Sequence, residues 1–333
     1  MSIRHIRKKQ VVNRVRRGRA TSQAAWRRSD EVDGDEAAFA TGDCLTGCPR
    51  VVFFGHGLVG RAGLRALFKM GLTPVVVFGH RPGPGDWQES LEASSRGMGI
   101  PFVEDADLAS GETADMLNEY RPDVLVSVYF RQVIPDTLLR LSVHGGINLH
   151  GSLLPKYRGR APVNWMLVKG ETEGGASLHV MTRRPDRGPL LGQMSFSITS
   201  LDTGFSLLNK VAETGSELLS QCLPGWLAGS LVPVKQGPGG FTCGRRGPED
   251  GLIDWTRPAR EIRNLVRAVT RPYPGAFGFL DGRRVDVWWV EETDSPSLSP
   301  GEFAFQGRQL LVGTGTKTVI LVDWCNPQGL SSP

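Results

Sequence analysis

The amino-acid sequence predicts an α/β protein with a largely parallel sheet and helices on both faces, followed by a small all-β domain. Between residues 50 and 150, short apolar segments alternate with helical patterns, which is typical of parallel strands joined by crossover helices. Between residues 276 and 324, four short β-type segments are separated by turn sequences, as in a small barrel or sandwich. A chain of 333 residues is long enough for both domains.

The elements of the first half follow from local patterns. Residues 51–54 are apolar and predict a buried strand, and a glycine-containing turn leads from it into a helix that Gly71 ends. The same alternation continues along the chain. We expect strands at 74–78, 101–103, 123–130 and 145–150, and helices near 87–97 and 112–119.

The second half predicts two further strands, a long helix and then the β domain. The segment from Asp202 to Leu227 repeats apolar residues at helical spacing and predicts a helix that covers the sheet. We expect its buried face to hold Phe205, Leu208, Val211, Ala212, Leu218, Leu219 and Cys222. The remaining elements are strands at 176–181 and 189–198, a helix at 257–269, and strands at 276–280, 285–290, 301–305 and 317–324.

The net charge of +5 comes from the N-terminal arm. Residues 1–28 hold ten Lys or Arg and no acid, which leaves 29 basic and 34 acidic residues in the rest of the chain. We interpret the arm as a solvated, disordered extension, with an organellar transit peptide or a nucleic-acid-binding tail as alternatives. The body of the protein is therefore acidic, and nucleic acid is not its expected partner.

Composition excludes several other classes. The five cysteines, Cys44, Cys48, Cys222, Cys243 and Cys325, are odd in number and scattered, which argues against a disulfide framework and for a reducing, cytoplasmic location. Cys44 and Cys48 have no second pair of ligands nearby, so we expect no metal. No run of eighteen apolar residues is present, so we expect no membrane span.

The chain divides into four parts on these grounds. We predict an N-terminal extension at 1–48, a catalytic domain at 49–235, a linker at 236–250 and a C-terminal domain at 251–330. The linker is rich in glycine and proline. The oligomeric state is open, and a homo-oligomer is allowed.

A glycine turn after the first strand is one candidate site. Gly55, Gly57 and Gly60 lie between a predicted strand and a helix, which is the position of a dinucleotide-binding fingerprint. The second strand ends without the acidic residue that would bind a ribose, although Arg81 could meet a 2′-phosphate. An NADP-binding oxidoreductase therefore stays an alternative, and a turn kept for close packing is preferred.

Asn148 and His150 form a more informative candidate site. Side chains alternate along a strand, so both point to the same face. A histidine can accept a proton from an amine, and an Asn amide can donate a hydrogen bond to an oxyanion. Asp186 stands in a Pro-Asp-Arg-Gly turn and could orient the histidine if the sheet brings it close. Residue spacing alone leaves a structural role for the Asn-His pair equally open.

Together these residues carry a family resemblance. The segment "INLHGSLLPKYRGRAPVNWMLVKGETEGGASLHVMTRRPDRGPLLGQ" resembles the 10-formyltetrahydrofolate-dependent formyltransferases, which share Asn-x-His, a Ser-Leu-Leu-Pro-x-(Tyr/Trp)-Arg-Gly loop and a downstream Asp-x-Gly. Within this family, "VSVYFRQVIPDTLL", "CGRRGPEDGLIDW" and "NLVRAVTRPYPGAF" look most similar to the UDP-4-amino-4-deoxy-L-arabinose formyltransferases of lipid A modification. The similarity runs from residue 50 to about residue 325.

The resemblance implies a Rossmann-like catalytic domain followed by an OB-like β-barrel domain. It implies that His150 is the general acid and base, that Asn148 stabilises the tetrahedral intermediate, and that Asp186 orients His150 and raises its pKa. The co-substrate would be 10-formyltetrahydrofolate, with no metal. Its binding residues would be Gln132, Val133, Ile134, Arg160, Thr182, Arg183, Arg184 and Pro185.

The acceptor implied by the resemblance is the amine of a nucleotide-linked amino sugar. Methionyl-tRNA is the alternative acceptor in this family. Residues 241–333 hold 11 basic and 11 acidic residues, which disfavours tRNA. A row of arginines at helical spacing keeps tRNA as a possible acceptor, although such a row also fits a solvated helix face or a contact between domains. These residues are Arg257, Arg260, Arg263, Arg267 and Arg271.

Overall fold

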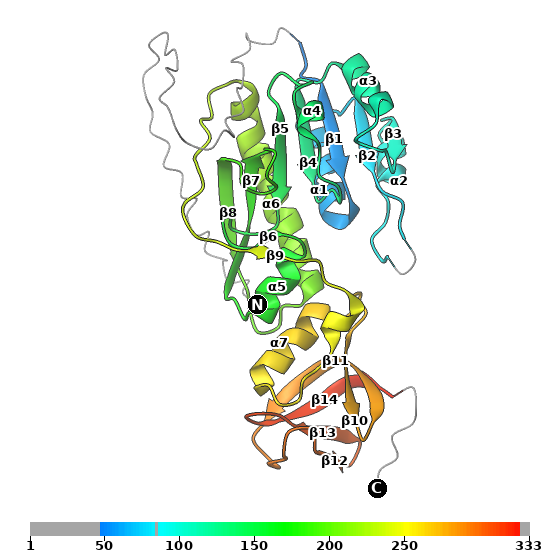
Figure 1. Ribbon diagram of the computed structural model, residues 1–333, viewed down its shortest axis with the longest axis vertical. Coiled ribbons are helices and arrows are strands. Elements are labelled where there is room, and N and C mark those ends of the chain that lie inside the picture. Colours follow the sequence, from blue (N-terminus) through cyan, green and yellow to red (C-terminus); the bar gives the residue numbers. More distant parts are fainter. Residues whose placement is uncertain (1–46, 84–85, 327–333) are drawn as a thin grey trace, which may run out of the picture.

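The structure is a computed structural model that describes residues 47–83 and 86–326. An α/β domain and a smaller β domain lie end to end along the long axis of the molecule (Figure 1). The basic arm predicted as an extension lies almost entirely outside the described residues, as do the last residues of the predicted C-terminal domain.

The α/β domain is built on a seven-stranded sheet in the order β3-β2-β1-β4-β5-β7-β8. The strands from β1 to β5 are parallel, and β7 and β8 are antiparallel additions at one side. Their bounds are β1 Val51–Gly55, β2 Val76–Gly79, β3 Phe102–Glu104, β4 Val124–Val128, β5 Gly146–His150, β7 Glu173–Val180 and β8 Leu190–Ser197. The largely parallel sheet predicted from the sequence is confirmed.

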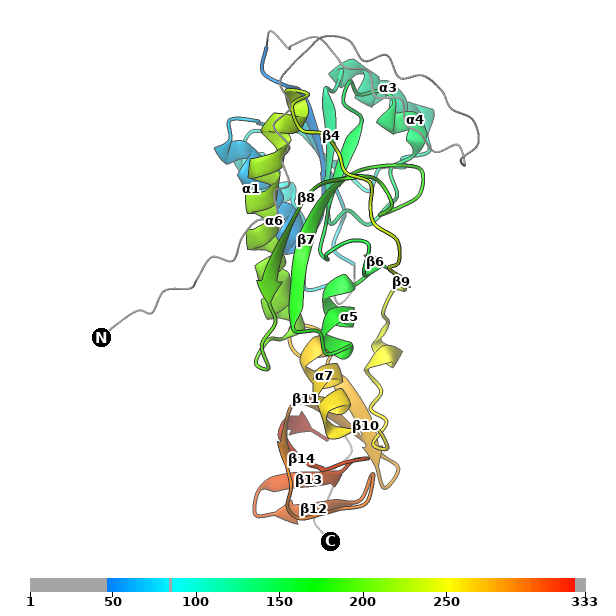
Figure 2. The same cartoon turned by 90° about the vertical axis from the view of Figure 1, so that its left-hand side faces the viewer.

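Helices cover both faces of this sheet, and the strands supply apolar side chains to each. On one face, Val51 and Phe53 pack with α1 (Gly57–Lys69) and α6 (Gly204–Leu227). On the other face, Val52 and Phe54 pack with α3 (Gly111–Tyr120) and α4 (Asp136–Leu139). Figure 2 shows α1 and α6 side by side on one side of the sheet, with α3 and α4 on the other. Because β1 is buried on both faces, it reads as a continuous apolar run.

Two local predictions differ from the structure. The helix expected near 87–97 is only α2, Glu92–Gly97, because Asp86 accepts a hydrogen bond from the backbone of Gln88 and holds this segment in a turn. Phe205 was expected on the buried face of α6 but is 37% exposed, and its ring meets the edge of Trp87 instead. The helices α4 and α5, the latter Pro162–Val168, were not predicted.

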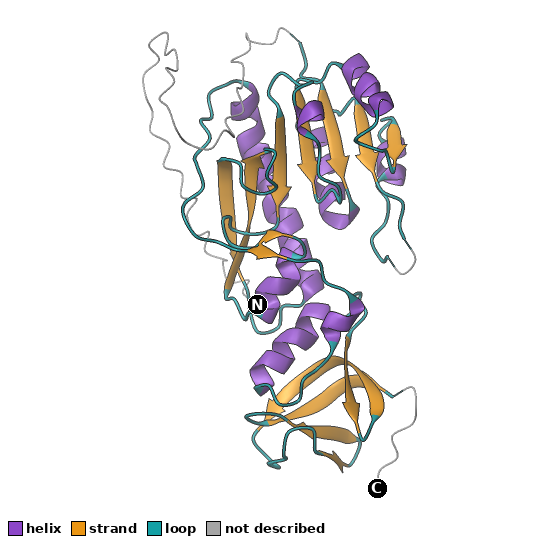
Figure 3. Ribbon diagram, in the orientation of Figure 1, coloured by secondary structure: helices purple, strands orange, loops and turns teal. Residues whose placement is uncertain are grey.

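The C-terminal part is a helix followed by one antiparallel sheet in the order β10-β11-β14-β13-β12 (Figure 3). The helix is α7, Ala259–Val269. The strands are β10 Ala276–Leu280, β11 Arg283–Thr293, β12 Phe303–Gln306, β13 Gln309–Gly313 and β14 Thr318–Cys325. The expected small β domain is confirmed; β13 was not predicted. Among the residues that the structure describes, no helix is long and apolar enough to cross a membrane.

The two domains share a buried contact. Asn164 on α5 donates through Nδ2 to the carbonyl oxygen of Ala268 on α7, at 2.7 Å. The guanidinium of Arg267, which is 6% exposed, donates to the carbonyl oxygens of Thr199 and Asp202. A Cβ at Gly204 would lie 2.4 Å from the Ala268 oxygen, so only glycine allows the start of α6 to approach α7 this closely.

The segment predicted as a linker also contacts the catalytic domain. Its short strand β9 (Thr242–Cys243) pairs in parallel with β6 (Arg158–Gly159), in the loop that follows Asn148 and His150. A 3₁₀-helix, Pro248–Gly251, then leads into the C-terminal part. The linker therefore supports the loop of the candidate site as well as joining the domains.

Candidate active site

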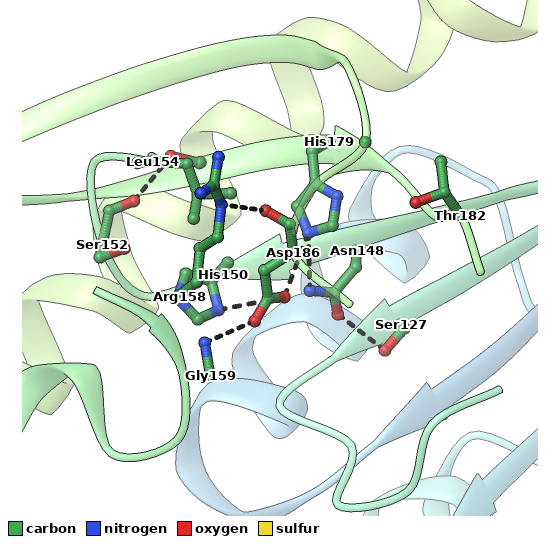
Figure 4. A network of polar contacts seen from close by, with 12 residues as sticks. Ser127, Asn148, His150, Ser152, Leu154, Arg158, Gly159, His179, Thr182 and Asp186 are labelled. Carbon is green, nitrogen blue, oxygen red and sulfur yellow. Dashed lines mark hydrogen bonds and ion pairs between the residues drawn. The ribbon is translucent and has the colours of Figure 1, made fainter. Parts of the chain in front are cut away.

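Strand β5 brings Asn148 and His150 to the carboxyl end of the parallel strands. Asn148 lies between Ser127 of β4 and His179 of β7 in the hydrogen-bonding register. Figure 4 shows the side chains of Asn148 and His150 with those of His179 and Asp186 in one polar cluster. The strand periodicity predicted from the sequence thus places Asn148 and His150 on one face, as expected.

The sheet brings Asp186 to the same cluster from the loop between β7 and β8. Its backbone is left-handed, with φ of 57°. Its Oδ2 accepts from the backbone N–H of Gly159 at 2.8 Å, and its carbonyl oxygen accepts from Arg158 and Gln236. The donors come from one segment that precedes this loop in the sequence, 158–159, and from Gln236, which follows it. Together they hold an otherwise unfavourable backbone conformation in place.

His150 is 7% exposed and has an acceptor near each ring nitrogen. Nε2 lies 2.7 Å from the carbonyl oxygen of Tyr157, which can only accept. Nδ1 lies 3.6 Å from Oδ1 of Asp186. An imidazole with a carbonyl on one side and a carboxylate on the other is best satisfied when both nitrogens carry protons. The surroundings of His150 therefore stabilise the ring once it has accepted a proton.

The carboxyl group of Asp186 is held in its charged form. Burial by itself would raise its pKa, but the nearby His150 and His179 and the N–H of Gly159 outweigh that effect and hold the pKa well below the ordinary value. This negative charge lies 3.6 Å from Nδ1 of His150. Asp186 therefore stays ionised near neutral pH.

His179 is a member of the cluster that the sequence did not reveal. It is 2% exposed, and its Nε2 lies 3.1 Å from Nδ2 of Asn148 and 3.5 Å from Oδ1 of Asp186. The sequence showed only that His179 lies within the predicted strand at 176–181. Whether that strand pairs with the strand of Asn148 depends on sheet order, which residue spacing does not give.

Three predicted binding segments meet next to this cluster. Arg160 donates through Nη2 to the carbonyl oxygen of Arg131 at 3.0 Å, and its neighbour Gly159 donates to Asp186. Arg160 thereby lies between the 131–134 loop and the 182–186 loop. In the second loop, Thr182 donates to the carbonyl oxygen of Arg184, and residues 183–185 are exposed.

The 132–134 segment is exposed in part. Val133 is 60% exposed, whereas Ile134 is 6% exposed and packs with the α3 and α4 core. Gln132 donates through Nε2 to the carbonyl oxygen of Ala106. Of these three residues, the side chain of Ile134 is turned into the protein, and that of Val133 is an exposed apolar surface.

The glycine turn before α1 is filled by protein. Gln88 accepts through Oε1 a hydrogen bond from the backbone N–H of Leu58 at 3.2 Å, and a Cβ at Gly57 would lie 1.8 Å from that oxygen. Arg81, the residue that could have met a 2′-phosphate, pairs with Glu104. These contacts favour the packing interpretation of the turn over a dinucleotide site.

A surface groove of about 770 Å³ runs along α1 and α6. It is lined at one end by Trp87 and Phe205 and along its length by charged side chains such as Arg65 and Glu213. Asn148, His150 and Asp186 do not line it. The groove is therefore separate from the polar cluster, and the cluster is identified by its chemistry rather than by cavity size.

The arginine row is largely engaged within the protein. Arg257 pairs with Glu261, Arg263 donates to the carbonyl oxygen of Ser200, and Arg271 pairs with Asp323. Arg267 is the buried domain contact described above, and Arg260 is exposed. Arg263 and Arg267 thus bind backbone of the catalytic domain, which supports the domain-contact interpretation. Within residues 47–83 and 86–326, no group of three or more His, Cys, Asp or Glu is placed to hold a metal ion.

Two family models match most of the chain. The model described as "Formyl transferase" matches residues 49–223, and the model described as "Formyl transferase, C-terminal domain" matches residues 246–329. Both regions of the structure described above therefore have counterparts in one family, and in the same order.

Solved structures show the same fold at low sequence identity. An N-formyltransferase from Helicobacter canadensis, in complex with folinic acid and dTDP-3-aminofucose, has a TM-score of 0.64 at 18% identity, over 82% of this chain and 98% of that chain. WlaRD, a sugar 3N-formyl transferase in the presence of dTDP and 5-N-formyl-THF, has a TM-score of 0.63 at 17% identity, over 85% and 100%.

HypX from Aquifex aeolicus, in complex with tetrahydrofolic acid, has a TM-score of 0.59 at 17% identity. The match covers 85% of this chain but only 45% of HypX. The fold is thus shared with proteins of different overall length. Because the family model of the catalytic domain alone matches more than half of the sequence, the chain belongs to the formyl transferase family and is a formyltransferase.

Proposed function

We propose that this enzyme transfers the formyl group of 10-formyltetrahydrofolate to the amine of a nucleotide-linked amino sugar. The observation that carries the proposal is the meeting of Asn148, His150 and Asp186 in one polar cluster of a formyl transferase fold. A base, an oxyanion donor and a fixed carboxylate are the groups that formyl transfer to an amine requires.

The proposed reaction is a direct transfer. The amine nitrogen of the acceptor forms a bond to the formyl carbon, and the bond between that carbon and N10 of the donor breaks as N10 takes up a proton. His150 accepts the proton that the amine loses, and the charge of Asp186 stabilises the resulting imidazolium. Asn148 donates through its amide to the oxyanion that develops on the formyl oxygen.

Binding of the donor is supported by the segments around Arg160. The exposed side chain of Val133 offers apolar surface for a flat ring, and backbone groups of the 182–186 loop offer polar contacts at its edge. Two of the solved relatives were determined with folinic acid or 5-N-formyl-THF. We therefore propose that Gln132, Val133, Arg160 and the loop from Thr182 to Pro185 bind the folate.

The acceptor is proposed from two kinds of similarity. The same two relatives were determined with dTDP-3-aminofucose or dTDP, which supports a nucleotide-linked sugar. The sequence resemblance favours UDP-4-amino-4-deoxy-L-arabinose within that class. Methionyl-tRNA is disfavoured because four of the five arginines in the row are engaged in contacts within the protein.

The test is an acceptor panel. Purified protein and 10-formyltetrahydrofolate are mixed in parallel with UDP-4-amino-4-deoxy-L-arabinose, several dTDP- and GDP-linked amino sugars and methionyl-tRNA. Release of tetrahydrofolate is followed together with product mass. We expect a gain of one formyl group on a nucleotide sugar and no gain in His150→Ala. Formylation of methionyl-tRNA alone, or of no acceptor by folded protein, would overturn the proposal.

A further inference from the structure

We infer that His179 is a positioning residue that fixes the orientation of the Asn148 amide, so that one amide N–H stays free to meet the developing oxyanion. The inference deepens the proposed function and rests on it. It is drawn from a chain of hydrogen bonds that runs from the backbone of β7 through His179 and Asn148 to Ser127 of β4.

The backbone determines which nitrogen of His179 carries the proton. Nδ1 lies 2.9 Å from the carbonyl oxygen of Val180. A carbonyl oxygen can only accept, so Nδ1 carries a hydrogen. In the neutral ring the other nitrogen, Nε2, is then an acceptor. The neutral ring therefore presents Asn148 with an acceptor at this position, whereas a proton on Nε2 would face Oδ1 of Asp186, 3.5 Å away.

That acceptor determines how the amide of Asn148 is turned. Nδ2 of Asn148 lies 3.1 Å from Nε2 of His179 and donates to it when the ring is neutral. At the other end of the amide, Oδ1 accepts from the hydroxyl of Ser127 at 2.8 Å. Both ends are thus held, and turning the amide over would bring its oxygen against the lone pair of Nε2. One of the two N–H groups of Nδ2 is used by His179, which leaves the second for the substrate.

The position of His179 is itself constrained. It is 2% exposed and lies between Asn148 and Asp186, whose Oδ1 is 3.5 Å from its Nε2 and 3.6 Å from Nδ1 of His150. If His179 only bound the carbonyl oxygen of Val180 in its own strand, it would not have to contact Asn148 or Asp186. The contact of Nε2 with Asn148 connects His179 to the reacting groups. An oxyanion donor is effective only when its N–H is already oriented toward the developing charge, and this contact orients the Asn148 amide.

A matched pair of variants separates this role from simple support of the fold. A glutamine at 179 places its amide where Nε2 lies, so its oxygen can accept from Asn148, while the bond to Val180 is lost. An asparagine is shorter and reaches only the Nδ1 position, so the Val180 bond can form while the acceptor for Asn148 is lost. We expect His179→Gln to keep most of the wild-type kcat. We expect His179→Asn to lower kcat on the order of 10- to 100-fold with KM for both substrates little changed.

A double-mutant cycle tests whether His179 acts through Asn148. In Asn148→Ala, the further change His179→Asn should cost almost nothing in kcat, because the amide that it positions is absent. The same substitutions at His144, which lies before the start of β5, at the opposite end of the strand from His150, and donates through its backbone N–H to Asp123, serve as controls for loss of a histidine. Ser127→Ala removes the bond at the other end of the amide and should lower kcat in the same direction, and it provides a second test should His179→Asn fail to fold.

The outcomes distinguish the two proposals. Wild-type protein that transfers formyl to no acceptor contradicts the proposed function. Active wild-type protein with equal kcat in His179→Gln and His179→Asn, or with additive losses in the double mutant, overturns the positioning role of His179 and leaves the proposed function in place.

Discussion

Oδ1 of Asp186 lies 3.6 Å from Nδ1 of His150 while the opposite ring nitrogen faces the carbonyl of Tyr157. Replacing the carboxylate by an amide of the same shape, Asp186→Asn, removes the charge that stabilises the imidazolium and keeps the volume. We expect kcat to fall about 10²- to 10⁴-fold with folate binding retained. Single-turnover kinetics and folate titration measure the two effects, and an unchanged kcat would remove Asp186 from the mechanism.

Gly159 joins the loop after β5 to Asp186. Its φ is 89°, and a Cβ there would lie 2.4 Å from the carbonyl oxygen of Cys243. Gly159→Ala should destabilise the fold by about 1–3 kcal/mol and displace the N–H that binds Asp186, so activity should fall as well. Chemical denaturation and kcat measure these changes. Gly83→Ala, at a position where a Cβ meets nothing, is the control.

Asp202 makes stability depend on acid pH. It accepts from Thr199, Ser206 and Lys210. Burial would raise its pKa, but these donors lower it from 3.8 to about 2. Because the folded pKa is below the unfolded one, the stabilisation is complete above pH 4 and is lost as pH falls toward 2. Wild-type protein should exceed Asp202→Asn in unfolding free energy by on the order of 1–2 kcal/mol at neutral pH. That difference should shrink between pH 4 and 2, and a constant difference would contradict the prediction.

The hydroxyl of Tyr129 is buried and makes no hydrogen bond within the described residues, and a Cβ at Gly151 would lie 2.0 Å from it. A buried donor without a partner costs about 1–3 kcal/mol. Tyr129→Phe should therefore leave the melting temperature unchanged or raise it by a few degrees. Differential scanning calorimetry checks this. A lower Tm would show that the hydroxyl has a bonding partner in solution.

Two members of the arginine row should behave differently. Arg267 is buried and donates to two carbonyl oxygens and to Asn264, so Arg267→Ala leaves buried acceptors unsatisfied. We expect a loss of about 2–4 kcal/mol in unfolding free energy. The exposed Arg260→Ala should change stability by less than about 0.5 kcal/mol. Equal effects of the two substitutions in urea denaturation would contradict the domain-contact interpretation.

The sheet and its covering helices were predictable because burial leaves a pattern in the sequence. Strands such as 51–54 are buried on both faces and read as apolar runs, and α6 repeats its apolar residues at helical spacing. Short elements such as β6 and β9 were not predictable, because each is only two residues long and forms only by pairing with the other. Phe205 was misplaced because an exposed aromatic ring on a helix edge has the same spacing as a buried one.

The candidate site was predictable where it depends on one strand and not where it depends on several. Asn148 and His150 share a face because strand side chains alternate. The proximity of Asp186 depends on a loop whose conformation needs a left-handed backbone and support from Gly159. His179 enters only because β7 pairs antiparallel to β5, and no local pattern encodes which strands become neighbours.

The close approach of Gly204 to Ala268 limits how this enzyme can be recombined with its relatives. An exchange of the C-terminal region at residue 250 would keep Gly204 and Asn164 but replace the helix backbone that they contact. A bulkier or shifted partner helix would then clash at Gly204, and Asn164 would lose its acceptor. A workable chimaera must exchange α5, α7 and the start of α6 together. The segments that have to be exchanged at this junction therefore belong to both domains.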